Sequence, residues 1–183
     1  MTPETARLVE HLKAHAVRTD GGPYTLRSGE VSSWYIDARQ TTFDGEGAMA
    51  VGAAMLQLIE DDVVAVGGMT IGADPIALAI AMSAASAGRP LRAFSIRKES
   101  KGHGLGGRLV GPVSSGDRVA MLEDTTTTGG ALLEAIDVAE SEGLVIAQVI
   151  SLVDRSSRRV AELVRGRGLT YRALVTPQML GVE

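Results

Sequence analysis

The sequence contains no cysteine, which excludes disulfide bonds, thiolate nucleophiles and cysteine metal sites. Aromatic residues make up only 3% of the chain. The net charge of −4 gives no general attraction to nucleic acid or to anionic lipid, so neither is an expected partner. Charges interrupt every apolar run near the N-terminus, so neither a signal peptide nor a membrane span is predicted there. We therefore expect a cytoplasmic protein in which any anion site is local.

The length and composition indicate a single domain covering residues 1–183. With 45% hydrophobic residues the chain can bury a core, and it is short for two domains. Residues from about 4 to 17 have the spacing of an amphipathic helix, and the β-prone runs 24–26 and 34–36 predict a hairpin-like pair outside the main sheet. From residue 63 onward, apolar runs alternate with helical stretches, which predicts a doubly wound α/β fold whose mainly parallel sheet is flanked by helices. The expected strands are 63–66, 91–96, 118–122, 145–153 and 171–175, with helices at about 74–87, after 130, and in a short segment before 171.

A threonine-rich segment after the expected strand 118–122 is the most informative part of the sequence. Glu123 and Asp124 lead into four threonines and two glycines, and an amphipathic helix follows that Gly143 is expected to end. Free N–H groups at a helix start bind anions, and threonine hydroxyls add donors. The two carboxylates would repel a bare phosphate, but they can accept hydrogen bonds from vicinal sugar hydroxyls. The pattern therefore predicts binding of a ribose 5-phosphate, and the GxxxxGK[ST] string of nucleotide-triphosphate P-loops does not occur in the chain.

A glycine-rich basic segment follows the expected strand 91–96. Its cations suit a mobile flap that closes over a departing pyrophosphate, and Lys101 and His103 could also protonate that leaving group. The string GHGLGG formally matches a dinucleotide fingerprint, but charged residues separate it from the strand and no helical pattern follows, so we reject that interpretation. The cations of this segment are Arg97, Lys98, Lys101, His103 and Arg108.

The string LEDTTTTGGA resembles the phosphoribosyl pyrophosphate motif of type I phosphoribosyltransferases, and RKESKGHGLGG resembles the catalytic loop of the orotate phosphoribosyltransferases among them. The resemblance implies transfer of the phosphoribosyl group to orotate, giving orotidine 5′-monophosphate and pyrophosphate in pyrimidine (UMP) biosynthesis. It implies a small N-terminal hood, about residues 1–45, on a core of about residues 46–183. It also implies that Arg97, Lys98, Lys101 and His103 are catalytic. These four would bind phosphoribosyl pyrophosphate together with Arg27, Glu123, Asp124, Thr125, Thr126, Thr127, Thr128, Gly129, Gly130 and Ala131.

The same resemblance implies an orotate site. Tyr35 and Ile36, next to Trp34, match the wall that contacts the base, and Thr127 matches a phosphate-loop threonine that also reaches it. Arg155 follows the run 145–153, so it is expected at the carboxyl end of a strand, where such sheets bind ligands. Its planar fork suits the carboxylate of orotate.

The resemblance further implies a homodimer in which the catalytic loop reaches the partner's active site. Mg²⁺ is the expected cofactor, held mainly by substrate phosphates and water, because no protein cluster has the composition of a metal cage. The chain departs from many relatives at two positions, with Arg27 and Gly72 where they have lysine.

Two alternatives stay open from the sequence. One is a phosphoribosyltransferase for another base, such as uracil or a purine. The other is a non-catalytic regulator that senses phosphoribosyl pyrophosphate, although the N-terminal segment offers one helix and no basic recognition element.

Overall fold

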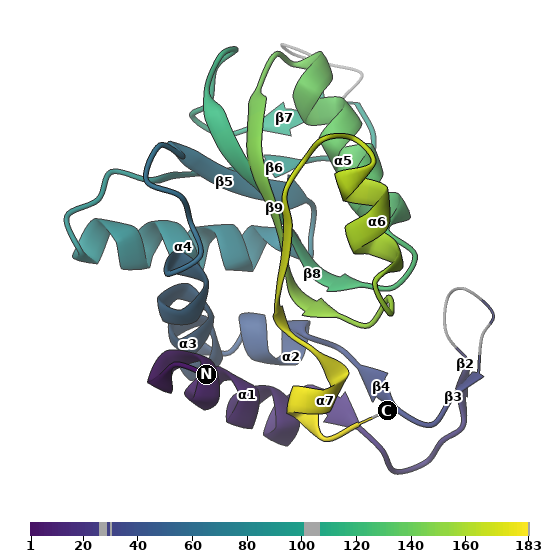
Figure 1. Cartoon of the computed structure of the whole chain (residues 1–183). Coiled ribbons are helices and arrows are strands. Elements are labelled where there is room, and N and C mark those ends of the chain that lie inside the picture. The colour runs from purple at the N-terminus through teal and green to yellow at the C-terminus, as the bar shows by residue number, and fades with distance from the viewer. Residues whose placement is uncertain (26–28, 30, 101–106, 183) are drawn as a thin grey trace.

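A six-stranded sheet forms the centre of the molecule in the computed structural model, which describes residues 1–25, 29, 31–100 and 107–182 (Figure 1). The strand order is β10–β9–β8–β5–β6–β7. β7 pairs antiparallel with β6, and every other neighbouring pair in this sheet is parallel. The predicted doubly wound α/β fold is therefore confirmed. The strands are β5 (Ala65–Met69), β6 (Arg92–Ile96), β7 (Leu109–Val110), β8 (Arg118–Thr126), β9 (Val145–Asp154) and β10 (Tyr171–Val175).

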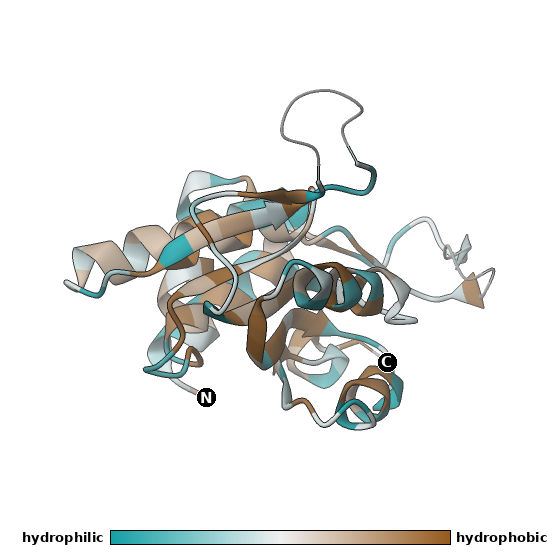
Figure 2. Ribbon diagram, turned by 90° about the horizontal axis from the view of Figure 1, so that it is seen from above, coloured by the Kyte–Doolittle hydropathy of each residue, from teal (hydrophilic) through white to brown (hydrophobic). Residues whose placement is uncertain are grey.

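Helices cover both faces of the sheet (Figure 1). α3 (Gly45–Leu56) and α4 (Ala73–Ser86) pack on one face, and α5 (Gly130–Ser141) and α6 (Arg159–Arg165) pack on the other. Side chains along β8 alternate between these two layers: Val119 and Met121 join the cluster with α5 and α6, whereas Ala120 and Leu122 join the cluster with α3 and α4. Figure 2 shows the apolar residues concentrated along the strands and the inward faces of the helices.

The predicted first helix is α1 (Pro3–His15), which begins one residue earlier and ends two earlier than expected. Thr2 caps it by accepting a hydrogen bond from the Thr5 N–H at 3.2 Å, and Leu8, Val9 and Leu12 bury its apolar stripe. α1 packs against α3 and also against the C-terminal α7 (Pro177–Leu180). One hydrophobic cluster therefore runs from the N-terminal helix into the sheet. None of the helices in the described part of the chain has the length and apolarity needed to cross a membrane.

The hairpin prediction was right about the place and wrong about the partners. β2 (Tyr24–Thr25) pairs with β3 (Val31–Ser32), while β4 (Tyr35–Ile36) pairs with β1 (Val17–Arg18). The change of partner follows from burial, because Trp34 and Ile36 turn into the core beside the end of α1 and leave β2 outside. A short helix, α2 (Arg39–Thr42), then leads into α3.

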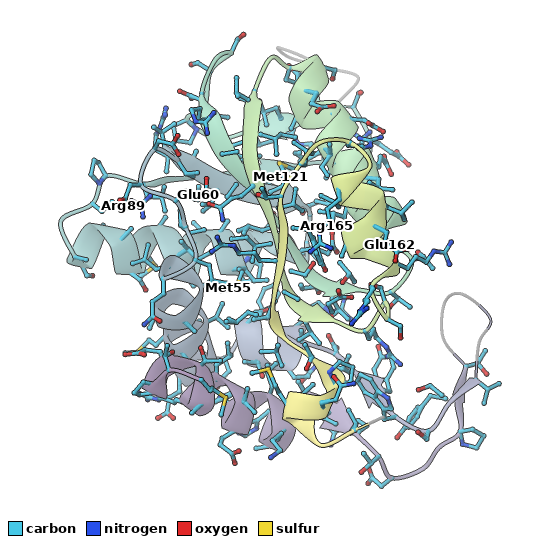
Figure 3. All side chains as sticks on the ribbon, in the orientation of Figure 1. Met55, Glu60, Arg89, Met121, Glu162 and Arg165 are labelled. Atoms are coloured by element: carbon cyan, nitrogen blue, oxygen red, sulfur yellow. The ribbon has the colours of Figure 1, made fainter. Side chains whose placement is uncertain are left out.

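A polar network holds the end of α3 against the sheet, away from the carboxyl ends of the strands. Arg89 and Glu60 lie close together (Figure 3). The Arg89 guanidinium donates to the backbone carbonyls of Ile59 and Glu60 at 3.2 and 2.5 Å. The Gln148 side chain accepts from the Glu60 N–H at 2.7 Å and donates to the Leu58 carbonyl at 2.9 Å. These bonds satisfy backbone groups of the turn that follows α3.

Candidate active site

A cavity of about 950 Å³ opens at the carboxyl ends of the parallel strands, where the fold was expected to bind its ligand. β8 and the start of α5 form its floor, and β4 and the segment after β9 form another wall. Most of the sequence-predicted site residues within the described part of the chain line it together. The lining residues are Thr25, Tyr35, Ile36, Met69, Lys98, Glu99, Glu123 to Leu132, Glu134 and Arg155.

The phosphate loop joins β8 to α5 as predicted, and Gly143 follows the end of α5. Gly129 has a φ of 83°, in the left-handed region that glycine adopts without strain, and a Cβ there would lie 3.1 Å from a methyl of Val160. The N–H groups of the first turn of α5 have no intrahelical acceptor, and the loop residues leading into that turn line the cavity. The segment therefore offers an anion site built from backbone donors and hydroxyls.

The acidic pair lies inside β8 rather than after it, because the strand continues to Thr126 instead of ending at 122. Burial, together with the negative charge of Asp124, raises the pKa of Glu123 to about 8. Burial also raises the pKa of Asp124, although its Oδ1 accepts a hydrogen bond from the Thr125 N–H at 2.7 Å. Among the described residues, Glu123 Oε2 and Thr125 Oγ1 are buried without a hydrogen-bond partner. Both atoms belong to cavity-lining residues, so a ligand rich in hydroxyl groups would satisfy them.

Gly72 places the turn between β5 and α4 directly against this acidic pair. A Cβ at residue 72 would lie 2.6 Å from Asp124 Cγ and under 3 Å from both carboxylate oxygens. Any side chain at this position would displace the Asp124 carboxylate from where it now sits. The glycine at position 72, where many relatives have lysine, therefore allows close contact between the turn and Asp124.

Thr126 is the member of the threonine run whose side chain turns away from the cavity. Its hydroxyl is buried and donates to Asp154 Oδ1 at 2.9 Å, and it also lies 3.1 Å from the Tyr171 hydroxyl. Thr126 therefore presents its backbone, and not its hydroxyl, to a ligand in the cavity.

Arg155 projects from the end of β9 and rests on the N-terminal hood. Its guanidinium carbon lies 4.0 Å from the centre of the Trp34 ring, and its Nη2 donates to Ser32 Oγ at 3.2 Å. Trp34 is buried, whereas Tyr35 faces the cavity beside Ile36. Trp34, which precedes the predicted base wall in the sequence, therefore supports the arginine through a cation–π contact.

The basic segment is only partly described. Lys98 lines the cavity, whereas Arg97 is half-buried at the end of β6 and is not among the lining residues. The interpretation of Arg108 as part of a cationic flap is wrong: its Nε donates to the Arg97 carbonyl at 2.7 Å and its Nη2 contacts Glu134 at 2.5 Å, so its charge is already neutralised. Lys101, His103 and Arg27 lie outside the described residues.

Sequence reasoning missed an ion pair near the acidic residues. Asp37 and Arg39 form a two-point ion pair with N–O distances of 2.7 and 3.2 Å, and the hydrogen bond from Arg39 lowers the pKa of Asp37. The positive charge of Arg39 also acts on Asp124, where it opposes the effect of burial on the pKa of that carboxyl. The nearness of Arg39 to Asp124 could not be read from the sequence, because it depends on how the hood folds against β8.

Comparison with known proteins identifies close relatives over nearly the whole chain, although no family model matches it. The chain is 41% identical over 177 residues to the orotate phosphoribosyltransferase of Streptomyces avermitilis, an alignment that covers 96% of each protein. It is also similar to the orotate phosphoribosyltransferase of Mycobacterium tuberculosis H37Rv, solved with Fe(III) dicitrate, at a TM-score of 0.86 and 36% identity, covering 98% of this chain and all of that one. A second structure of the M. tuberculosis enzyme, in complex with phosphoribosyl pyrophosphate, is similar at a TM-score of 0.82 and 33% identity over 98% of this chain.

Proposed function

The chain belongs to the orotate phosphoribosyltransferase family, and from that premise we propose how its residues divide the reaction between them. It is a phosphoribosyltransferase that transfers the 5-phosphoribosyl group from phosphoribosyl pyrophosphate to orotate, in pyrimidine biosynthesis. In this reaction the bond from C1 of the ribose to pyrophosphate breaks and a bond from C1 to a ring nitrogen of orotate forms. Pyrophosphate leaves with the electron pair, and the ring nitrogen loses its proton. The protein must therefore position two anions and stabilise the charge that develops on the leaving group.

The sugar-phosphate part of the donor is assigned to the floor of the cavity. In this assignment the 5-phosphate binds the loop Thr127–Ala131 at the start of α5, and the ribose hydroxyls donate to the carboxylates of Glu123 and Asp124. The observation that carries this assignment is the coincidence, in one cavity, of an open helix N-terminus with the unpartnered atoms Glu123 Oε2 and Thr125 Oγ1.

Orotate is assigned to the opposite wall. Tyr35 and Ile36 provide an apolar surface for the ring, and the guanidinium of Arg155 binds the carboxylate. Thr127 lies between the two substrate positions and can contact both. This arrangement brings the base within reach of C1 while its carboxylate lies next to the only cation, apart from Lys98, among the described lining residues.

Charge balance supports a need for further cations in the cavity. Among the described lining residues, Lys98 and Arg155 are cations, and Glu99 and Asp124 are carboxylates; Glu134 is paired with Arg108, and Glu123 is mostly protonated at neutral pH. Pyrophosphate would add more negative charge. We assign the missing positive charge to Lys101 and His103, which can also protonate the leaving group, and to Mg²⁺.

The residues present fit Mg²⁺ in the way expected for this metal. The described residues contain no group of three or more histidine, aspartate or glutamate side chains that could hold a metal. The acidic pair instead offers carboxylate oxygens, including the unpartnered Glu123 Oε2, beside the proposed ribose position. Mg²⁺ characteristically binds through one or two carboxylates, substrate oxygens and water, and when bound it neutralises charge on the pyrophosphate.

A homodimer is part of the proposal, as is a cytoplasmic location. Leu78 and Met82 expose apolar side chains four residues apart on one face of α4, and Ile71 is exposed in the turn before this helix. Exposed apolar patches of this kind mark interaction surfaces, and a second copy of the chain is the proposed occupant. The catalytic loop would then reach across to the partner's cavity.

We expect the protein to consume orotate in the presence of phosphoribosyl pyrophosphate and Mg²⁺, as followed by ultraviolet absorbance. Removal of Mg²⁺ with a chelator should reduce turnover to background, and readdition should restore it. Uracil and hypoxanthine should be poor acceptors under the same conditions, because neither has a carboxylate for Arg155. Turnover with uracil or hypoxanthine and none with orotate would contradict the substrate, and tight donor binding without any turnover would favour a regulator.

Binding of phosphoribosyl pyrophosphate is expected to release a proton from the acidic pair. Because the pKa of Glu123 in the empty site is raised to about 8, this carboxyl is mostly protonated at neutral pH, whereas accepting hydrogen bonds from ribose hydroxyls favours the carboxylate. Affinity should therefore rise with pH up to about 8 and then level off. The same shift should lower the free energy of unfolding of the empty protein as the pH rises from 4.5 to about 8.

Calorimetry in two buffers of different ionisation enthalpy measures the number of protons released when phosphoribosyl pyrophosphate binds. The phosphates of the donor also titrate near neutral pH, so the informative quantity is the difference between the wild type and Glu123→Gln. We expect the variant to release fewer protons, and Asp124→Asn to bind the donor more weakly. Equal proton release by the wild type and Glu123→Gln would refute the assignment of the proton to the pair.

A further inference from the structure

A buried polar network lies beneath the cavity and takes no direct part in the chemistry described so far. It links three neighbouring strands: Thr126 at the end of β8, Ser151 and Asp154 of β9, and Tyr171 of β10. The Tyr171 hydroxyl donates to Ser151 Oγ at 3.0 Å and lies 3.1 Å from Thr126 Oγ1, which in turn donates to Asp154 Oδ1 at 2.9 Å. Burial raises the pKa of Tyr171 to about 12, so its hydroxyl keeps its proton and stays a donor.

The Asp154 carboxylate accepts hydrogen bonds from the end of β8 and from the residue that follows Arg155. Its Oδ1 accepts the hydrogen bond from the Thr126 hydroxyl at 2.9 Å and a second one from the Ser156 N–H at 2.8 Å. Between these two contacts, the Arg155 N–H donates to the Thr126 carbonyl at 3.0 Å. The backbone of Arg155 is therefore fixed to the end of β8, one residue before the phosphate-loop residue Thr127.

The turn after Arg155 needs this support, because it contains strained backbone. Ser157 and Arg158 have φ values of 50° and 76°, in the left-handed region that side chains other than glycine rarely adopt. The Ser156 hydroxyl accepts from the Val160 N–H at 3.1 Å, so Asp154 and Ser156 together hold the two ends of the turn. Strained conformations of this kind persist only where the surrounding contacts fix them.

The other end of the Arg155 side chain is held by the hood, through Trp34 and Ser32. The direction of the guanidinium is thus set by two supports, one at its backbone and one at its tip. We propose that Asp154 is a positioning residue for Arg155, which it ties to the phosphate loop so that the guanidinium faces the orotate carboxylate. This inference rests on the proposed function, in which Arg155 binds that carboxylate.

The test compares Asp154→Ala with Asp154→Asn in the full chain. The alanine variant removes the acceptor for Thr126 and Ser156, and we expect the KM for orotate to rise about tenfold or more while the KM for phosphoribosyl pyrophosphate changes by less than about threefold. The asparagine variant keeps a carbonyl oxygen at the same position, so its KM for orotate should stay within about threefold of the wild type. An unchanged orotate KM in folded Asp154→Ala would overturn the proposal.

One control separates positioning from general loss of stability. Tyr171→Phe removes the buried hydroxyl but leaves both hydrogen bonds to Asp154 Oδ1, so it should lower the Tm and leave the orotate KM unchanged. A rise in orotate KM in Tyr171→Phe equal to that in Asp154→Ala would show that the effect is not specific to Asp154.

If Asp154→Ala does not fold, Thr126→Val provides a second test, because it removes one of the two donors to Asp154 with little change of shape. We expect a few-fold rise in the orotate KM of this variant. No rise would count against the proposal.

The double variant Asp154→Ala/Arg155→Ala distinguishes this inference from the function on which it rests. Since Asp154 acts through Arg155, the double variant should bind orotate no worse than Arg155→Ala alone. Additive effects would reject the positioning role while leaving the role of Arg155 intact. An orotate KM unchanged by Arg155→Ala itself would instead reject the proposed orotate site.

Discussion

Replacement of Lys101 by alanine is expected to lower kcat about a thousandfold while the KM for phosphoribosyl pyrophosphate changes by less than about threefold. The reason is that the charge on pyrophosphate develops as the bond to C1 breaks, so a cation placed against the leaving group stabilises the transition state more than the bound substrate. The described lining residues strengthen this expectation, since Lys98 and Arg155 are the only cations among them and Arg155 is assigned to orotate. Steady-state kinetics with both substrates varied gives kcat and KM separately.

The chain offers a matched control for this variant. Lys13 lies on the exposed face of α1, where it contacts only Glu10 at 3.4 Å among the ion pairs of the described residues, so Lys13→Ala should leave kcat and KM unchanged. A fall in kcat of similar size in Lys13→Ala would point to a general effect of removing charge. An unchanged kcat in Lys101→Ala would remove this residue from the mechanism.

Mixing of subunits tests whether the loop acts in the partner's cavity. At an orotate concentration near the wild-type KM, Lys101→Ala and Arg155→Ala subunits should each be nearly inactive alone, because one lacks the loop lysine and the other lacks the base-binding arginine. In a mixed dimer with shared loops, one cavity combines the intact Lys101 with the intact Arg155. Random association in equal amounts should then restore about a quarter of the wild-type activity. No recovery after mixing, with dissociation and reassociation shown by light scattering, would mean that each loop serves its own subunit.

The strand-to-loop pattern around Glu123 could be read from the sequence because its signals are local. An apolar run, an acidic pair, small hydroxyl residues and an amphipathic helix occur in order along one segment, and the parallel sheet then brings the other strand ends to the same edge. The end of β8 was predicted four residues too early, at 122 rather than Thr126. Polar side chains after residue 122 look like a strand end in sequence, but pairing with β9 carries the ladder through Thr126.

The supports of the site could not be predicted, because they are contacts between segments far apart in the chain. The ion pair of Arg108 with Glu134, the packing of Trp34 under Arg155 and the burial of the Thr126 hydroxyl each depend on tertiary packing. For Arg108 and Thr126 the residue type suggested a different role, that of a loop cation and that of a phosphate donor. Residue type shows what chemistry a side chain can do, whereas the direction in which it points depends on its neighbours.

Replacement of Arg155 by alanine is expected to raise the KM for orotate about a hundredfold, with a smaller change in the KM for phosphoribosyl pyrophosphate. A guanidinium paired with a carboxylate makes charge-assisted hydrogen bonds worth about 1.5–3 kcal/mol each, and a hundredfold change corresponds to about 2.7 kcal/mol. The structure makes this loss hard to compensate, because Lys98 is the only other cation among the described lining residues and it follows β6, whereas Arg155 follows β9. Orotate titrations at saturating donor measure the effect.

A comparison of orotate with uracil tests the role of Arg155 more directly than the orotate KM alone, because uracil lacks the carboxylate. If Arg155 binds that group, Arg155→Ala should lower kcat/KM for orotate by a large factor and leave the slow reaction with uracil almost unchanged, so the preference for orotate collapses. Arg155→Lys should fall between the two, since an ammonium keeps the charge but loses the planar fork and its fit against Trp34. Equal losses with orotate and uracil would mean that Arg155 supports the hood against β9 and does not recognise the carboxylate. Tyr35, Ile36 and Thr127 alone would then have to hold the base.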